Sequence, residues 1–66
     1  MFMEFQVCRR GREPRWVVTL GKTVYGAYLD KEQALLDAVD AARDALAAGN
    51  EAQVWVRERA KTARVF

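Results

Sequence analysis

Hydrophobic and polar side chains alternate along the first part of the chain, as expected for β-strands that bury one face. The alternation covers residues 4–10 and then residues 15–20, with a turn around Pro14 between them. Phe5 and Val7 share one face of the first run, and Trp16 begins the apolar face of the second. Both runs therefore predict strands that pack one side against a core.

Gly21 and Lys22 fit a two-residue type II′ hairpin loop, which requires glycine at its first position. The third predicted strand then covers residues 23–28 and pairs with the second. Gly26 weakens this strand and is typical of a bulge. Strict alternation from the loop places Tyr25 and Ala27 on the Trp16 face, and Val24 and Tyr28 on the opposite face.

A helix is predicted from Lys31 to about Ala48, because apolar residues there recur at helical spacing. Asp30 precedes it as an N-cap, with Gln33 three residues on as in a capping box. Gly49 suits the left-handed position that ends a helix. The expected buried stripe consists of Leu35, Ala38, Val39, Ala42, Ala45 and Leu46.

The last alternating run, residues 52–59, predicts a strand that buries Val54 and Val56 and turns Trp55 outward. Residues 60–66 form either a flexible tail or a short returning strand. The chain is thus expected to be one α+β domain spanning residues 1–66. Its predicted architecture has two layers in the order β-β-β-α-β, with one helix packed on a mainly antiparallel sheet. A right-handed crossover would place the fourth strand beside the first and parallel to it.

The net charge of +2 hides an uneven distribution along the 66 residues. Residues 9–15 contain four Arg against one Glu, and residues 57–64 contain three Arg and one Lys against one Glu. Residues 30–48 contain five acids against two bases. If the first and fourth strands are parallel, both basic clusters lie at one end of the sheet, and the helix forms an acidic side.

The composition offers little for catalysis. There is no His to act as a base near neutral pH, and Cys8 is a single thiol expected to be a small buried or half-buried residue within a strand. Acids spaced along the helix, such as Asp37 and Asp40, fit a solvated face better than a metal site. We therefore expect a non-enzymatic cytoplasmic protein with no catalytic residue, no cofactor, no metal and no membrane segment.

The sheet face turned away from the helix should combine aromatic, aliphatic and Arg side chains, which is typical of an interaction surface. The first hypothesis is a homodimer or a protein partner bound there. The alternative is a nucleic-acid-binding sheet platform, with aromatic rings stacking on bases and Arg side chains contacting phosphates, including those of Arg9 and Arg12. The residues predicted for this interaction face are Val17, Tyr28, Trp55, Arg10, Arg15, Arg57 and Arg59.

Three motifs resemble a small bacterial domain family of unknown function (number 2188): Trp16-Val17-Val18, Asp30-Lys31-Glu32-Gln33-Ala34 and Val54-Trp55-Val56. This resemblance covers about fifty residues and implies the same fold, with no assigned activity to transfer. The chain departs from the family pattern after the last strand, where Arg57-Glu58-Arg59-Ala60-Lys61 replaces an Asp-Gly turn. The strand order and the helix start are also similar to the HicB-like antitoxin domain, which would imply binding to a toxin. The Pro-rich segment that precedes the helix in that family is missing here.

Overall fold

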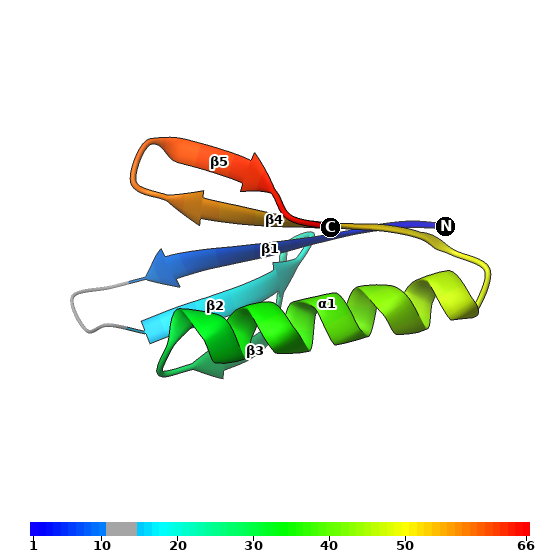
Figure 1. Ribbon diagram of the computed structural model, residues 1–66, viewed down its shortest axis with the longest axis horizontal. Coiled ribbons are helices and arrows are strands. Elements are labelled where there is room, and N and C mark those ends of the chain that lie inside the picture. Colours follow the sequence, from blue (N-terminus) through cyan, green and yellow to red (C-terminus); the bar gives the residue numbers. More distant parts are fainter. Residues whose placement is uncertain (11–14) are drawn as a thin grey trace.

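In the computed structural model, which describes residues 1–10 and 15–66, one helix packs against one face of a five-stranded mixed sheet (Figure 1). The strands follow the spatial order β3-β2-β1-β4-β5. This arrangement confirms the predicted α+β class. The elements are β1 (Phe2–Arg10), β2 (Arg15–Leu20), β3 (Thr23–Tyr28), α1 (Lys31–Ala47), β4 (Glu51–Glu58) and β5 (Lys61–Arg64).

Strand β1 occupies the centre of the sheet, antiparallel to β2 and parallel to β4. The parallel pairing starts at the first residue, because the Glu51 amide donates to the Met1 carbonyl at 2.9 Å. It continues to Cys8, which lies opposite Arg57. The predicted position of the fourth strand, beside the first and parallel to it, is therefore confirmed. Of the two alternatives for the C-terminal segment, the structure has the returning strand, β5, antiparallel to β4.

Local signals at both ends of α1 fix its length. The Asp30 side chain accepts a hydrogen bond from the Gln33 amide at 2.8 Å, as expected of an N-cap. At the other end Gly49 has a φ of 88°, and the Asn50 amide donates to the Ala45 carbonyl at 2.9 Å, which is a Schellman arrangement. Within the described residues, no helix has the length and apolar character needed to cross a membrane.

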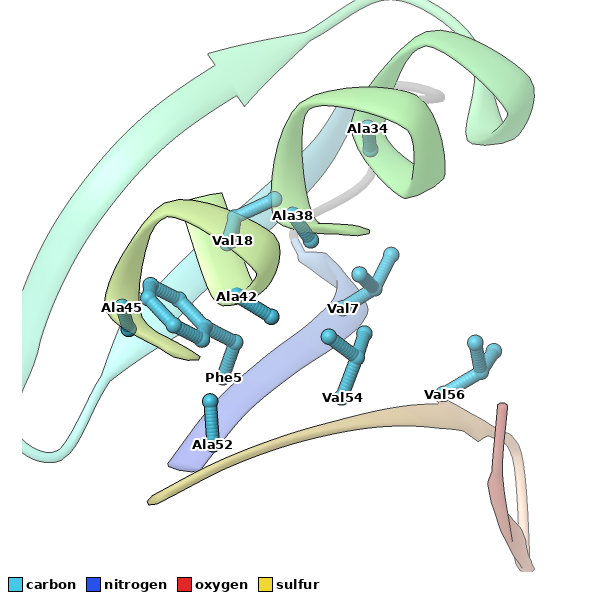
Figure 2. Close-up of a cluster of buried hydrophobic side chains, with 10 residues drawn as sticks. All are labelled: Phe5, Val7, Val18, Ala34, Ala38, Ala42, Ala45, Ala52, Val54 and Val56. Atoms are coloured by element: carbon cyan, nitrogen blue, oxygen red, sulfur yellow. The ribbon is translucent and has the colours of Figure 1, made fainter. Parts of the chain in front are cut away.

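The core forms where a row of alanines on α1 meets valines and one phenylalanine from the sheet (Figure 2). The predicted stripe is partly wrong: Leu46 is 47% exposed, and Leu35 and Val39 are only half-buried beside the row. Alanine has little bulk, so this row lets the helix axis approach the sheet, and the larger residues are left on its flank. The buried row is Ala34, Ala38, Ala42 and Ala45.

A β-bulge in β3 corrects the predicted faces of that strand. Gly21 has the φ of 61° that a type II′ turn needs, and Val24 lies opposite Thr19 as predicted. The register then shifts by one residue, so that Tyr28 lies opposite Trp16 and packs against the core. The predicted positions of Tyr28 on the outer face and Ala27 on the Trp16 face are therefore wrong, because an extra residue in a strand reverses the faces beyond it.

Gly26 makes room for the Tyr28 ring. A Cβ atom at Gly26 would lie 2.6 Å from the Tyr28 hydroxyl oxygen, so the ring occupies the space above the glycine. From there the hydroxyl lies near the Asp37 carboxylate on α1, whose negative charge favours the protonated form of the hydroxyl. Burial and this carboxylate together raise the pKa of Tyr28 to about 12, from an ordinary value of 10.0.

We predict that the protein loses stability at alkaline pH through Tyr28. Its hydroxyl is protonated in the folded state up to a higher pH than in the unfolded chain. Its stabilising contribution is therefore complete below pH 10 and declines as pH rises towards 12. Thermal unfolding followed by circular dichroism at several pH values should show this decline. Tyr28→Phe should show a smaller decline over the same interval, and an identical decline in both proteins would contradict the prediction.

Candidate functional site

The sheet face that α1 leaves uncovered, called the outer face below, contains a polar hollow of about 470 Å³. Strands β1, β2 and β4 form its floor, and the β2–β3 and β4–β5 turns form its rim. Its volume lies within the range of ligand sites, roughly 300–1,000 Å³. We call it the basic hollow, and its lining residues are Gln6, Cys8, Arg9, Thr19, Gly21, Lys22, Arg57 and Arg59.

The fold brings these residues together from distant parts of the sequence. The parallel pairing of β1 and β4 sets Arg57 beside Cys8, and Arg9 follows directly in β1. The hairpin loop contributes Lys22, and the turn after β4 contributes Arg59. The two basic clusters of the sequence thus meet at this hollow through Arg9, Arg57 and Arg59, as the parallel arrangement predicted.

Electrostatics make the hollow a candidate anion site. Its lining includes four cationic side chains and, within the part of the chain that the structure describes, no carboxylate. None of these four side chains has an ion-pair or hydrogen-bond partner among the residues that the structure describes. Gathered like charges repel one another and create a positive potential that attracts anions. Arg side chains also present several N–H donors in a plane, which matches the oxygens of a phosphate group.

Trp55 lies on the outer face next to the hollow. Its cross-strand neighbours are Gln6, which lines the hollow, and Arg64 on β5. The ring is half-buried, and its Nε1–H donates a hydrogen bond to the Gln53 side chain at 3.0 Å. This bond fixes the orientation of the indole, so that an aromatic surface of defined position adjoins the cations.

The structure only partly assembles the interaction face predicted from the sequence. Trp55, Arg57 and Arg59 do gather there. Val17 is on the outer face but only 5% exposed, between its cross-strand partners Cys8 and Ala27. Tyr28 lies on the opposite side of the sheet, for the reason given above.

The other two predicted Arg residues, Arg10 and Arg15, lie on either side of the β1–β2 connection. Arg15 is exposed at the beginning of β2, and Arg10 lies opposite it at the end of β1. The side chain of Arg10 and the whole of Arg12 fall outside the part of the chain that the structure describes. Arg9, expected to contact phosphates under the nucleic-acid alternative, lines the hollow.

Sequence reasoning missed Lys22, which was treated as a turn residue alone. A long cationic side chain in a two-residue loop can extend over the adjacent sheet face, and this would have been the signal. Cys8 was expected to be buried or half-buried, and the structure has it half-buried in the hollow as a free thiol. Among residues 1–10 and 15–66, no group of three or more His, Cys, Asp or Glu is placed to hold a metal ion.

Comparison of the chain with protein-family models, with curated proteins and with solved structures gives no match. The resemblances described above therefore rest on sequence motifs alone, and the site must be interpreted from its own chemistry.

The β4–β5 turn contains backbone strain. Arg59 and Ala60 connect Glu58 to its cross-strand partner Lys61, so this is a two-residue hairpin loop. Arg59 has a φ of 51°, in the left-handed region, at the position that Gly21 occupies in the other two-residue loop. A side chain there costs about 1–2 kcal/mol relative to ordinary backbone. The turn therefore holds a cation where local geometry favours glycine.

We predict that Arg59→Gly stabilises the protein. Relief of the left-handed strain should raise the free energy of unfolding by about 1 kcal/mol. For a domain of this size, that corresponds to a rise in Tm of roughly 4–8 °C. Thermal unfolding by circular dichroism measures the effect.

Two matched variants separate strain from charge. Arg59→Ala removes the cation but keeps the strained φ, so its Tm should stay close to that of the original protein. Gly21→Ala introduces the same strain in the other loop and should lower the Tm. An equal gain from Arg59→Ala and Arg59→Gly would identify charge repulsion, and not the backbone, as the cause.

Proposed function

We propose that this chain is a non-enzymatic module that binds single-stranded nucleic acid across the outer face of its sheet. Phosphates occupy the basic hollow, and a base stacks on Trp55 beside it. The observation that carries the proposal is the convergence of four cations on one hollow, where the described residues 1–10 and 15–66 provide neither an ion-pair partner nor a carboxylate in the lining. A phosphate backbone supplies the missing negative charges, and an aromatic platform next to them suits an unpaired base.

The apolar content of the outer face favours nucleic acid over a flat protein interface. Val17 is buried and Tyr28 lies on the other face, so two of the apolar side chains predicted to contact a protein partner are not available there. Trp55, the aromatic side chain of the predicted face that does lie there, is surrounded by Gln and Arg side chains. Aromatic rings interleaved with cations are the usual composition of single-strand binding surfaces.

The negative charge of the helix layer favours approach of a nucleic acid from the opposite side, towards the outer face. Exposed acids such as Asp40 and Asp44 belong to α1, on the side of the sheet opposite the outer face. A polyanion is therefore repelled from the helix and attracted to the hollow. This polarity orients the protein on its ligand before any close contact forms.

The test is the affinity for a fluorescently labelled oligothymidylate, measured by anisotropy over a range of salt concentrations. If the four cations of the hollow contact phosphates, the slope of log K against log salt should be about −3. Lys22→Ala and Arg57→Ala should each reduce the steepness of that slope by about 0.7. Arg43→Ala, which removes the same charge from an exposed position on the helix, is the matched control and should leave the slope unchanged.

Trp55→Leu tests the stacking contact separately. Loss of one stacked base should weaken binding by about 1–3 kcal/mol without changing the salt slope. Binding that is indifferent to salt, or Arg43→Ala acting as strongly as Lys22→Ala, would contradict the proposal.

A second candidate function, homodimerisation, is favoured by the edge strand β3. All six of its residues are uncharged, whereas the other edge strand, β5, begins with Lys61 and ends with Arg64. Val24 and Tyr25 on β3 are 50% and 52% exposed, and Leu29 beyond it is 86% exposed. An uncharged, exposed edge is able to pair with the same edge of a second copy.

Light scattering tests this second candidate. A dimer through β3 would have a mass of about 15 kDa, twice the 7.5 kDa of the chain. Val24→Lys should return the mass to that of one chain, because a charge on the edge opposes strand pairing. The control is Thr62→Lys on β5, which should leave the dimer intact. A single-chain mass for the unmodified protein at high concentration would rule the dimer out.

A further inference from the structure

The helix-covered side of the sheet has a groove that no other part of the described chain fills. α1 contacts β1, β2, β3 and β4 but not β5, so the helix-side surface of the β4–β5 hairpin stays open (Figure 1). The resulting groove has a volume of about 770 Å³. Its apolar lining consists of Trp16, Leu35, Val56, Ala60, Ala63 and Val65.

The rim of this groove is cationic. Arg9, Arg59 and Lys61 line it without an ion-pair partner among the described residues. The one acid in the lining, Glu58, is already paired with Lys31. An apolar floor below an uncompensated positive rim fits a ligand that combines a flat apolar group with negative charge.

Two residues belong to both sites. Arg9 and Arg59 line the groove as well as the basic hollow, so the two sites meet at the end of β1 and the β4–β5 turn. A tryptophan is also present at each site, because Trp55 lies next to the hollow on the outer face and Trp16 lines the groove. The strained Arg59 therefore stands at the point where a ligand would cross from one face to the other. Strain retained at such a position is typical of a functional contact.

We propose that a single strand bound on the outer face turns around the β4–β5 turn and places an unpaired base in the groove against Trp16. Arg9 and Arg59 hold the phosphates at the crossing point. This inference rests on the proposed function and narrows it, because a base can enter the groove only if it is unpaired. A duplex, whose bases are stacked inside the helix, can reach the outer face with its phosphates but cannot fill the groove.

The two tryptophans allow each face to be observed separately. In Trp55→Phe protein, fluorescence reports on the groove through Trp16, and in Trp16→Phe protein it reports on the outer face through Trp55. The probes are a single-stranded oligothymidylate, a duplex of the same length and poly-glutamate. We expect the single strand to quench both reporters in a saturable, salt-sensitive way. The duplex and poly-glutamate should leave Trp16 unchanged.

These outcomes distinguish failure of this inference from failure of the proposed function. If the single strand changes the fluorescence of Trp55 but not that of Trp16, the proposed binding in the groove is contradicted and the proposed binding on the outer face is retained. If the fluorescence of neither tryptophan changes, both proposals are contradicted. Quenching of Trp16 by poly-glutamate to the same extent would assign the groove to an acidic peptide and overturn the inference.

Two substitutions at the groove complete the test. Ala63→Leu places extra bulk in the groove without changing any charge, so it should abolish the Trp16 response and preserve the Trp55 response. Arg59→Gly and Arg59→Ala should each lower the affinity reported by Trp16 about tenfold, because each removes one charge-assisted contact to a phosphate at the crossing point. Arg43→Ala is again the charge control. A Trp16 titration that is unchanged by Ala63→Leu would show that no base enters the groove.

Discussion

The close approach of α1 to the sheet through its alanine row is the constraint on which the rest of this structure depends. Small side chains at Ala34, Ala38, Ala42 and Ala45 let the helix lie directly over β1 and its neighbours (Figure 2). A single narrow helix cannot cover five strands, so β5 has no contact with it. The tight core and the open groove beside β5 therefore have the same origin. A bulkier helix face would bury less of the central strands and would stand further from the sheet.

The central position of β1 is the second organising feature. Because β1 pairs with β2 on one side and β4 on the other, basic residues from both ends of the sequence converge at one end of the sheet. The charge of the whole chain is small, yet its distribution gives an acidic helix layer and a basic sheet end.

Much of the fold could be predicted from the sequence, because its signals are local. Asp30 caps α1, Gly49 ends it, and Gly21 fixes the first hairpin. The face of Tyr28 could not be predicted from alternation, since the bulge at Gly26 reverses it. Helical periodicity also overestimated the burial of Leu46, because periodicity identifies the apolar side of a helix but does not show how close the sheet lies to it.

The candidate site was harder to predict than the fold. Arg57 and Arg59 could be assigned to it, since the parallel pairing of β1 and β4 follows from a general handedness rule. Lys22 and the groove could not, because they depend on how far a loop side chain extends and on where the helix ends its cover of the sheet. Both depend on the tertiary structure and leave no periodic pattern in the sequence.

The parallel pairing of β1 with β4 also affects how the chain folds during synthesis. β2 and β3 can join β1 soon after they leave the ribosome, since short loops connect the three strands. The other edge of β1 must wait until α1 and β4 have been made. During that interval an unpaired strand edge rich in apolar residues is exposed, so folding speed in the cell depends on how quickly the second half of the chain, which contains α1 and β4, is synthesised.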